Sequence, residues 1–96
     1  MYSVRYDNGT YKVEDFHTDR ITISVTKLYV GQSTRGHYHP NDEVYYIVQG
    51  EGSLLLGEEI INLNPDKFIY IPCNAVHKVV NTGKTTLMFV CAWIGG

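Results

Sequence analysis

The sequence contains little alanine, proline or cysteine, and it has no long apolar segment. Only two of its 96 residues are Ala, which disfavours long helices because Ala is the strongest helix former. Its two cysteines, Cys73 and Cys91, lie far apart and form no Cys-x-x-Cys pair. That excludes a disulfide framework and a zinc finger, and it predicts a reducing, cytoplasmic compartment. No apolar run is long enough to cross a bilayer, so we expect no membrane partner.

Charge is also sparse. Charged residues make up 19% of the chain, and the formal net charge is −2. Because no excess of Lys and Arg is available to neutralise phosphates, nucleic acid is excluded as a partner. Residues 1–20 contain several charged side chains and no apolar block, which predicts that no secretory signal is present. The apolar share of 44% is that of an ordinary globular domain, and we expect one domain over residues 1–96.

Eight tyrosines and frequent polar–apolar alternation favour β-strands. Short strands are expected over residues 1–6, 10–13, 21–30, 43–49, 53–56, 59–63, 67–71, 76–81 and 85–94, with turn residues between them. About eight to ten strands at this spacing predict an all-β fold, an antiparallel sandwich or barrel. Residues 21–94 would form the barrel, preceded by an arm of N-terminal strands over residues 1–20.

Two segments carry additional expectations. In residues 21–30 the apolar positions change parity after Val25, which predicts a bulge or a crossing between two sheets. Residues 85–94 are apolar at both parities, so we expect both faces of that strand to be buried. The N-terminal strands also hold more aromatic surface than a small barrel buries, which predicts a homodimer whose interface uses sheet faces, with these strands added to the partner's sheet or packed across it. The alternative is a monomer in which the N-terminal strands fold back over their own barrel.

The candidate site residues are three histidines and one carboxylate. His37 and His39 are two residues apart, so in an extended segment both rings lie on one side. Glu43 begins the next strand, and His77 comes from a distant one. Three imidazoles and a carboxylate suit one divalent transition metal among Mn, Fe, Zn, Ni, Cu and Co, with positions left open for water or substrate. Taken singly, Glu43 also fits a surface carboxylate and His77 a histidine at the edge of the core.

The spacing of these residues resembles a known family. The pattern Gly31-x5-His37-x-His39-x3-Glu43-x6-Gly50 is similar to the first motif of the cupins, and Pro72, His77 and Asn81 match the second. Asp66 and Asn74 stand where the second motif usually has glycine. Asn tolerates the left-handed backbone that glycine would adopt there, and Asp fits a turn.

Membership of the cupin family implies a double-stranded β-helix, or jelly-roll barrel, and usually a dimer. It also implies that His37, His39, Glu43 and His77 hold the metal. A weaker local similarity to the archaeal cupin-type glucose-6-phosphate isomerases covers Gly36 to His39, Tyr45, Gly52, Tyr70 and Gly83 as well as the motif residues. Those isomerases are longer and space their glutamate further from the second histidine.

Two further residues are candidates for contact with a small-molecule ligand. Strand alternation from Glu43 sends Tyr45 inward, where its phenol would serve catalysis or substrate binding, or simply pack in the core. Arg35 precedes the ligand loop, where it would hold a carboxylate or phosphate or remain a solvated loop residue. We therefore expect a metal-binding protein with a pocket for an organic acid, a sugar or another oxygen-rich molecule, with isomerase and oxygenase as the candidate activities. A non-catalytic sensing module and a barrel stabilised by its metal are the alternatives.

Overall fold

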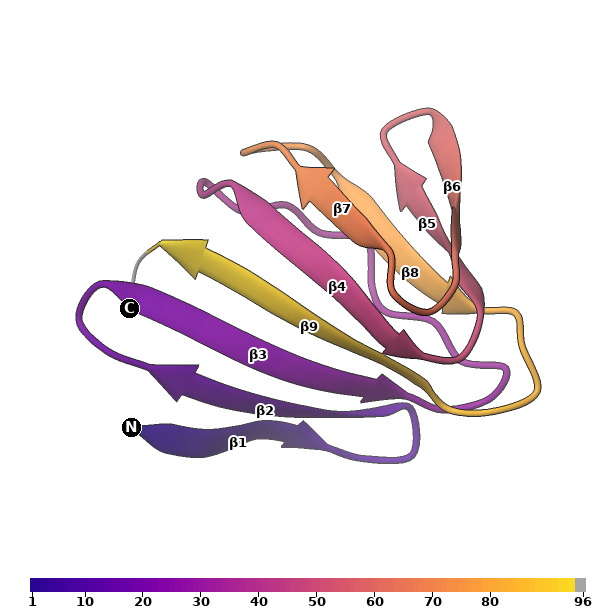
Figure 1. Ribbon diagram of the computed structural model, residues 1–96, viewed down its shortest axis with the longest axis horizontal. Coiled ribbons are helices and arrows are strands. Elements are labelled where there is room, and N and C mark those ends of the chain that lie inside the picture. Colours follow the sequence, from indigo (N-terminus) through magenta and orange to yellow (C-terminus); the bar gives the residue numbers. More distant parts are fainter. Residues whose placement is uncertain (95–96) are drawn as a thin grey trace.

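The computed structural model describes residues 1–94, which form nine strands in two antiparallel sheets (Figure 1). The strands are β1 (Tyr2–Asp7), β2 (Tyr11–His17), β3 (Ile21–Leu28), β4 (Glu43–Gln49), β5 (Gly52–Leu56), β6 (Glu59–Leu63), β7 (Phe68–Ile71), β8 (His77–Asn81) and β9 (Leu87–Ile94). The all-β prediction and the predicted strand number are both confirmed. No helix within residues 1–94 is long and apolar enough to span a membrane.

The larger sheet has the order β1-β2-β3-β9-β4-β7, and the smaller has the order β6-β5-β8. The two N-terminal strands extend the chain's own large sheet, since β2 pairs with β3 along its whole length. The core lies between the sheets and is built from side chains such as Leu28, Ile47, Leu54 and Leu87, none of which is exposed. Burying each of these side chains contributes about 2 kcal/mol.

The predicted bulge in the segment 21–30 is wrong. Strand β3 pairs with β2 and with β9 in continuous register, so nothing changes its parity. Its polar face is the buried one, because Thr22, Ser24 and Thr26 point inward while Ile21 and Ile23 remain exposed. The inner polar residues do not meet a purely apolar core: Thr26 lines a pocket, and Ser24 donates a hydrogen bond to the Asp15 carboxylate.

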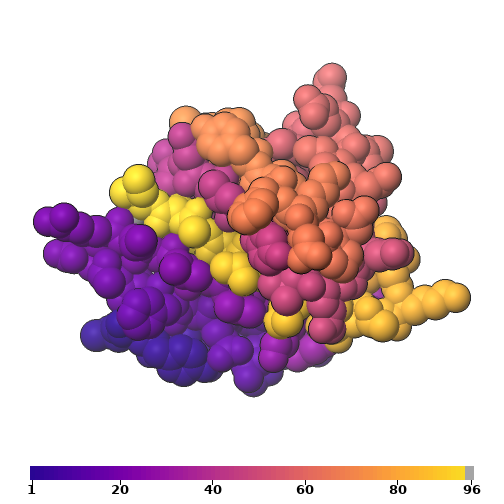
Figure 2. All heavy atoms as spheres, in the orientation of Figure 1, coloured from indigo at the N-terminus to yellow at the C-terminus, as the bar shows by residue number. Residues whose placement is uncertain are grey.

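Strand β9 is buried on one face, and the prediction of two buried faces is wrong for this chain by itself. Leu87, Phe89 and Cys91 point into the core, while the alternate residues are partly exposed. The other side of β9 belongs to the outer face of the large sheet, which Figure 2 shows with the yellow atoms of β9 between those of β3 and β4. The chain's own core does not cover that side. Its apolar residues therefore require another explanation.

Three tight turns hold the strands that carry the site. Gly50 has φ 89°, and a Cβ atom there would lie 2.7 Å from the carbonyl oxygen of Thr86. Asp66 and Asn74 have φ of 67° and 63°. The two positions at which the sequence departs from the motif glycines therefore adopt the left-handed backbone, which Asp and Asn accept more readily than other non-glycine residues.

Candidate metal centre

Two of the three histidines face each other because their backbones pair. The segment before β4 runs antiparallel to β8, and His37 and His77 exchange both main-chain hydrogen bonds, at 3.1 and 2.8 Å. This pairing brings the two rings to a centroid distance of 4.3 Å, although forty residues of chain separate them. Residue His77 itself is 1% exposed.

The remaining two residues come from the loop and from the start of β4. The carbonyl of His39 accepts a hydrogen bond from the Asn74 N–H, and the Asp42 carboxylate accepts one from the Cys73 N–H. These contacts tie the loop to the turn before β8. Glu43 Oε1 then lies 3.1 Å from His39 Nε2 and 3.8 Å from His77 Nε2.

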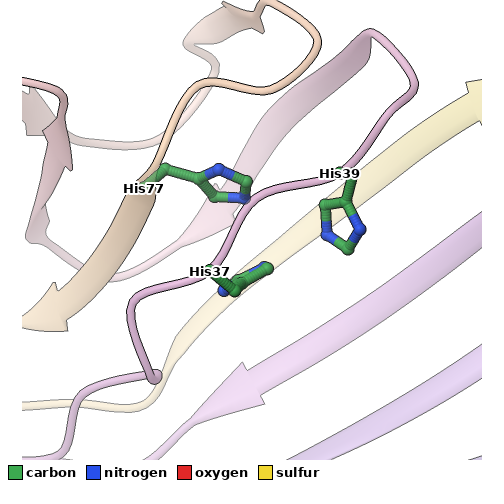
Figure 3. A group of neighbouring side chains, drawn as sticks. All are labelled: His37, His39 and His77. Carbon is green, nitrogen blue, oxygen red and sulfur yellow. The ribbon is translucent and has the colours of Figure 1, made fainter.

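The three imidazoles converge on one point (Figure 3), and their nearest ring nitrogens all lie within 4.8 Å of one another. Two of the rings have a fixed tautomer. The Nδ1–H of His37 donates to the Arg35 carbonyl at 2.8 Å, and that of His77 donates to the Ala75 carbonyl at 2.9 Å. Because Nδ1 carries the proton, Nε2 of each ring keeps a lone pair for a metal. The cluster is therefore compatible with a divalent metal site.

The electrostatics of the cluster favour the neutral form of His39 and His77. Burial, together with smaller effects of the neighbouring His37, His77 and Arg5, lowers the pKa of His39 to about 4. Burial also lowers the pKa of His77. Neutral imidazole is the form that binds metals, so no proton has to leave these two rings near neutral pH.

Glu43 is shifted in the opposite sense. Burial, partly offset by the positive charge of Arg5, raises the pKa of its carboxyl to about 7. Glu43 Oε1 and His77 Nε2 are both buried, and neither has a hydrogen-bond partner among the described residues. Buried polar atoms without partners are rare and call for an explanation. A cation between these two atoms would satisfy both of them, so the donor set fits a metal ion.

The fold and this cluster agree with the comparisons to known proteins. Residues 24–93 match the family described as Cupin domain. This chain is a cupin. Among characterised sequences, the glucose-6-phosphate isomerase of Thermococcus gammatolerans is 33% identical over 87 residues, which cover 76% of this cupin and 46% of the isomerase. The isomerase of Thermococcus kodakarensis is 32% identical over the same shares. This cupin thus spans about half the length of the curated isomerases that it matches.

Solved structures show the same architecture. An RmlC-like cupin from Shewanella frigidimarina superimposes with a TM-score of 0.84 at 17% identity, covering 98% of this chain and 84% of the other. An RmlC-like cupin with a double-stranded β-helix fold from Methanocaldococcus jannaschii gives a TM-score of 0.83 at 24% identity, covering 99% and 89%. The predicted double-stranded β-helix is therefore confirmed.

A pocket of about 430 Å³ adjoins the histidines. Its walls hold both ligand-contact candidates predicted from the sequence, Tyr45 and Arg35. Tyr45 is buried, burial raises the pKa of its phenol well above the usual value, and its ring meets His77 edge-on at 6.1 Å. Arg35 is exposed at the pocket rim and forms no ion pair within residues 1–94. Phe89 and Trp93 of β9 both line the pocket.

One charged residue of the pocket wall was not predicted from the sequence. Arg5 of β1 lines the same pocket, together with Tyr6, although both belong to the arm that precedes the conserved motifs. Its guanidinium lies 6.0 Å from the centre of the Trp93 ring, and that ring stacks on His39. An alternating strand gives no sign that two consecutive residues face inward, so no local signal identifies Arg5.

Proposed function

We propose that this cupin binds one divalent transition metal through His37, His39, Glu43 and His77. The observation that carries the proposal is the pair of buried atoms without hydrogen-bond partners, Glu43 Oε1 and His77 Nε2, which face the same point. Two backbone carbonyls support the proposal, because they hold His37 and His77 in the metal-binding tautomer. A mixed nitrogen and oxygen donor set suits Mn, Fe, Co, Ni, Cu and Zn alike.

The role of the metal in the proposal is to bind a small oxygen-rich molecule in the adjoining pocket. A bound divalent ion supplies Lewis acidity toward a carbonyl or hydroxyl oxygen. The pocket volume of about 430 Å³ suits a small metabolite such as a sugar or an organic acid. Tyr45 lines this pocket with its ring edge-on to His77, and in the proposal its phenol donates a hydrogen bond to such a ligand. The open pocket favours ligand binding over an ion that only stabilises the barrel.

The metal assignment is tested by elemental analysis and by Zn²⁺ titration. Protein purified without chelator is expected to hold one transition-metal ion per chain. The double variant His37→Ala/His39→Ala should lose stoichiometric Zn²⁺ binding, because no other side chain replaces two imidazoles. His17→Ala removes a histidine outside the cluster and serves as the matched control. One ion per chain in the double variant would refute the assignment.

The similarity to glucose-6-phosphate isomerases favours one candidate reaction, the metal-dependent isomerisation of a phosphorylated sugar. Isomerisation between an aldose and a ketose needs a polarised carbonyl and a group that moves protons, and Tyr45 is the pocket residue proposed to donate one. A coupled assay of glucose 6-phosphate formation from fructose 6-phosphate, with Mn²⁺-loaded and metal-free protein, tests this candidate. Activity that requires Mn²⁺ and falls in Tyr45→Phe would support it.

The outer face of the large sheet supports a homodimer. Six residues opposite one another in register form a continuous row across all six strands: Tyr2, Phe16, Ile23, Ala92, Val44 and Tyr70. Five of the six are exposed in the single chain. A contiguous apolar surface of this kind is typical of a protein interface, and a second copy of the same face would cover it with twofold symmetry.

Light scattering at micromolar concentration tests the dimer. Wild-type protein should have twice the mass of a 10.9 kDa chain. Val44→Glu, which places a charge in the middle of the row, should give the single-chain mass with an unchanged circular dichroism spectrum. Ile60→Glu changes an exposed residue of the smaller sheet and should leave the dimer intact. A wild-type mass near that of one chain would refute the dimer.

A further inference from the structure

A β-bulge in the edge strand β1 aims Arg5 into the pocket. Val4 pairs with Glu14 and Tyr6 pairs with Val13, so Arg5 is an extra residue with no partner on β2. In a regular strand Arg5 and Tyr6 would point to opposite faces of the sheet. Both instead line the pocket. Bulges are known to re-aim side chains beside functional sites, and this one adds a cation to the wall of a pocket.

The Arg5 guanidinium is held in a defined orientation. Its Nε contacts Asp15 Oδ2 at 3.0 Å, and its Nη2 donates to Asp15 Oδ1 at 3.2 Å and to Ser24 Oγ at 3.3 Å. Ser24 is fully buried and also donates to the Asp15 carboxylate. A guanidinium has five N–H donors, and Nη1 takes part in none of these contacts. The side chain is therefore pre-oriented and retains donors for a ligand.

Arg5 lies at a short distance from the histidine cluster. Two steps of 6.0 Å connect it to the cluster, from Arg5 Cζ to the Trp93 ring and from that ring to the stacked ring of His39. The pocket wall contains a second guanidinium, Arg35, and Glu43 is its single carboxylate among the described residues. Since Glu43 belongs to the metal ligands in our proposal, no lining carboxylate opposes the arginines; Asp15 pairs with Arg5, and Arg35 has no ion pair within residues 1–94.

We infer that Arg5 and Arg35, which line the same pocket as His37 and His39, bind an anionic group of its ligand. The ligand is then a small carboxylate or phosphate ester, with its anionic group on the arginines and its hydroxyl or carbonyl oxygens toward the histidines. This inference rests on the proposed function. Arg suits it better than Lys would, because its fork of donors matches the oxygens of a carboxylate or phosphate.

Three probes that share a three-carbon skeleton test the inference on the full chain loaded with Zn²⁺. Glycerate carries a carboxylate, glycerol 3-phosphate carries a phosphate, and glycerol is the neutral reference. Calorimetric titration should show at least tenfold tighter binding of one or both anions than of glycerol. The tighter of the two anions identifies the natural anionic group. Added NaCl should weaken binding of the anions and leave glycerol binding unchanged.

Variants then locate the anion site. Arg5→Gln should lose tenfold or more in anion affinity and leave the glycerol affinity unchanged, whereas Arg5→Lys should lose less because it keeps the charge. Arg20→Gln, in an exposed turn, is the matched control. If Arg5→Gln does not fold, as judged by circular dichroism, Arg35→Gln tests the second arginine of the pocket wall.

Two kinds of failure are distinguishable. Failure of the wild-type protein to bind Zn²⁺ would refute the metal assignment. Normal Zn²⁺ binding with anions bound no more tightly than glycerol, or with full anion affinity in both arginine variants, would overturn the anion site alone.

Discussion

Replacing Glu43 by Gln should stabilise the metal-free protein at pH 8 and destabilise the metal-loaded protein at the same pH. The carboxyl of Glu43 is buried, residue exposure being 2%, and one of its oxygens has no hydrogen-bond partner within residues 1–94. Gln keeps the size and polarity of the side chain and removes its charge. The variant therefore isolates the free energy of holding a carboxylate in this place without a metal.

The magnitude follows from the pKa. Burial raises the pKa of Glu43 from 4.5 to about 7, and each pKa unit corresponds to about 1.36 kcal/mol. When folding raises the pKa of a carboxyl, the group costs no stability at pH values below its pKa in the unfolded state. Its cost then grows as pH rises, and it is complete above the pKa in the folded state. Metal-free wild-type protein should thus lose about 3 kcal/mol between pH 4.5 and pH 8 through this group. Glu43→Gln should lose none of it.

Urea unfolding followed by Trp93 fluorescence measures the difference. After chelator treatment, wild type and Glu43→Gln should have similar free energies of unfolding at pH 4.5, and the variant should be more stable by about 3 kcal/mol at pH 8. The titration of His39 is common to both proteins and cancels. Saturating Zn²⁺ at pH 8 should reverse the order, because the metal binds the carboxylate more tightly than the amide.

Glu58→Gln is the matched control, since it removes the same charge from an exposed hairpin turn. It should change neither the metal-free nor the metal-loaded free energy of unfolding by more than about 0.5 kcal/mol. A metal-free Glu43→Gln variant that is less stable than wild type at pH 8 would refute the reasoning. It would mean that the ionised carboxylate is stabilised by its histidine neighbours rather than destabilised by burial.

Three further predictions concern the same site and its supports. Zn²⁺ affinity should fall about tenfold per pH unit between pH 7 and pH 5, because Glu43, with a pKa of about 7, must lose its proton to bind, and a flat calorimetric profile would contradict this. Gly50→Ala should lower the free energy of unfolding by about 2–3 kcal/mol, because the new Cβ would lie 2.7 Å from the Thr86 carbonyl oxygen at φ 89°; urea unfolding measures it, and a loss below about 0.5 kcal/mol would be inconsistent with the backbone contact. Asn81→Leu should lower the thermal midpoint by about 10 °C or more, since it deletes the hydrogen bonds from Asn81 to the Leu28 and Thr85 carbonyls. An unchanged midpoint would show that water replaces the lost hydrogen bonds.

The strands and the histidine cluster could be predicted from the sequence because their signals are local or closely spaced. Polar–apolar alternation and turn residues act over a few positions, and they located the strands found in the structure, including the inward set Glu43, Tyr45 and Ile47 on β4. The spacing of His37, His39 and Glu43 indicated one cluster because a bend in the chain returns the carboxylate to the two rings. His77 was identified from its position in the second motif. The structure adds the backbone pairing with His37, which brings His77 to the other two histidines.

Tertiary structure alone decided which face of a strand is the inner one. Alternation in β3 divides its residues into two sets, but the choice between them depends on β2 and β9, which lie on either side of it. The inner set proved to be the polar one: Thr26 lines the pocket, and Ser24 is hydrogen-bonded to Arg5 and Asp15. The inner side of β9 could likewise not be chosen from its sequence, because both of its sides are apolar.

The place of Arg5 was also decided only by the tertiary structure. A bulge is a property of the register between two strands, and the register of β1 on β2 is set by every pair along both strands rather than by the residue that protrudes. The sequence by itself determined an all-β chain with a histidine and carboxylate cluster. Folding added a guanidinium from the N-terminal edge strand to that cluster's pocket, because only packing places residues 5 and 93 side by side.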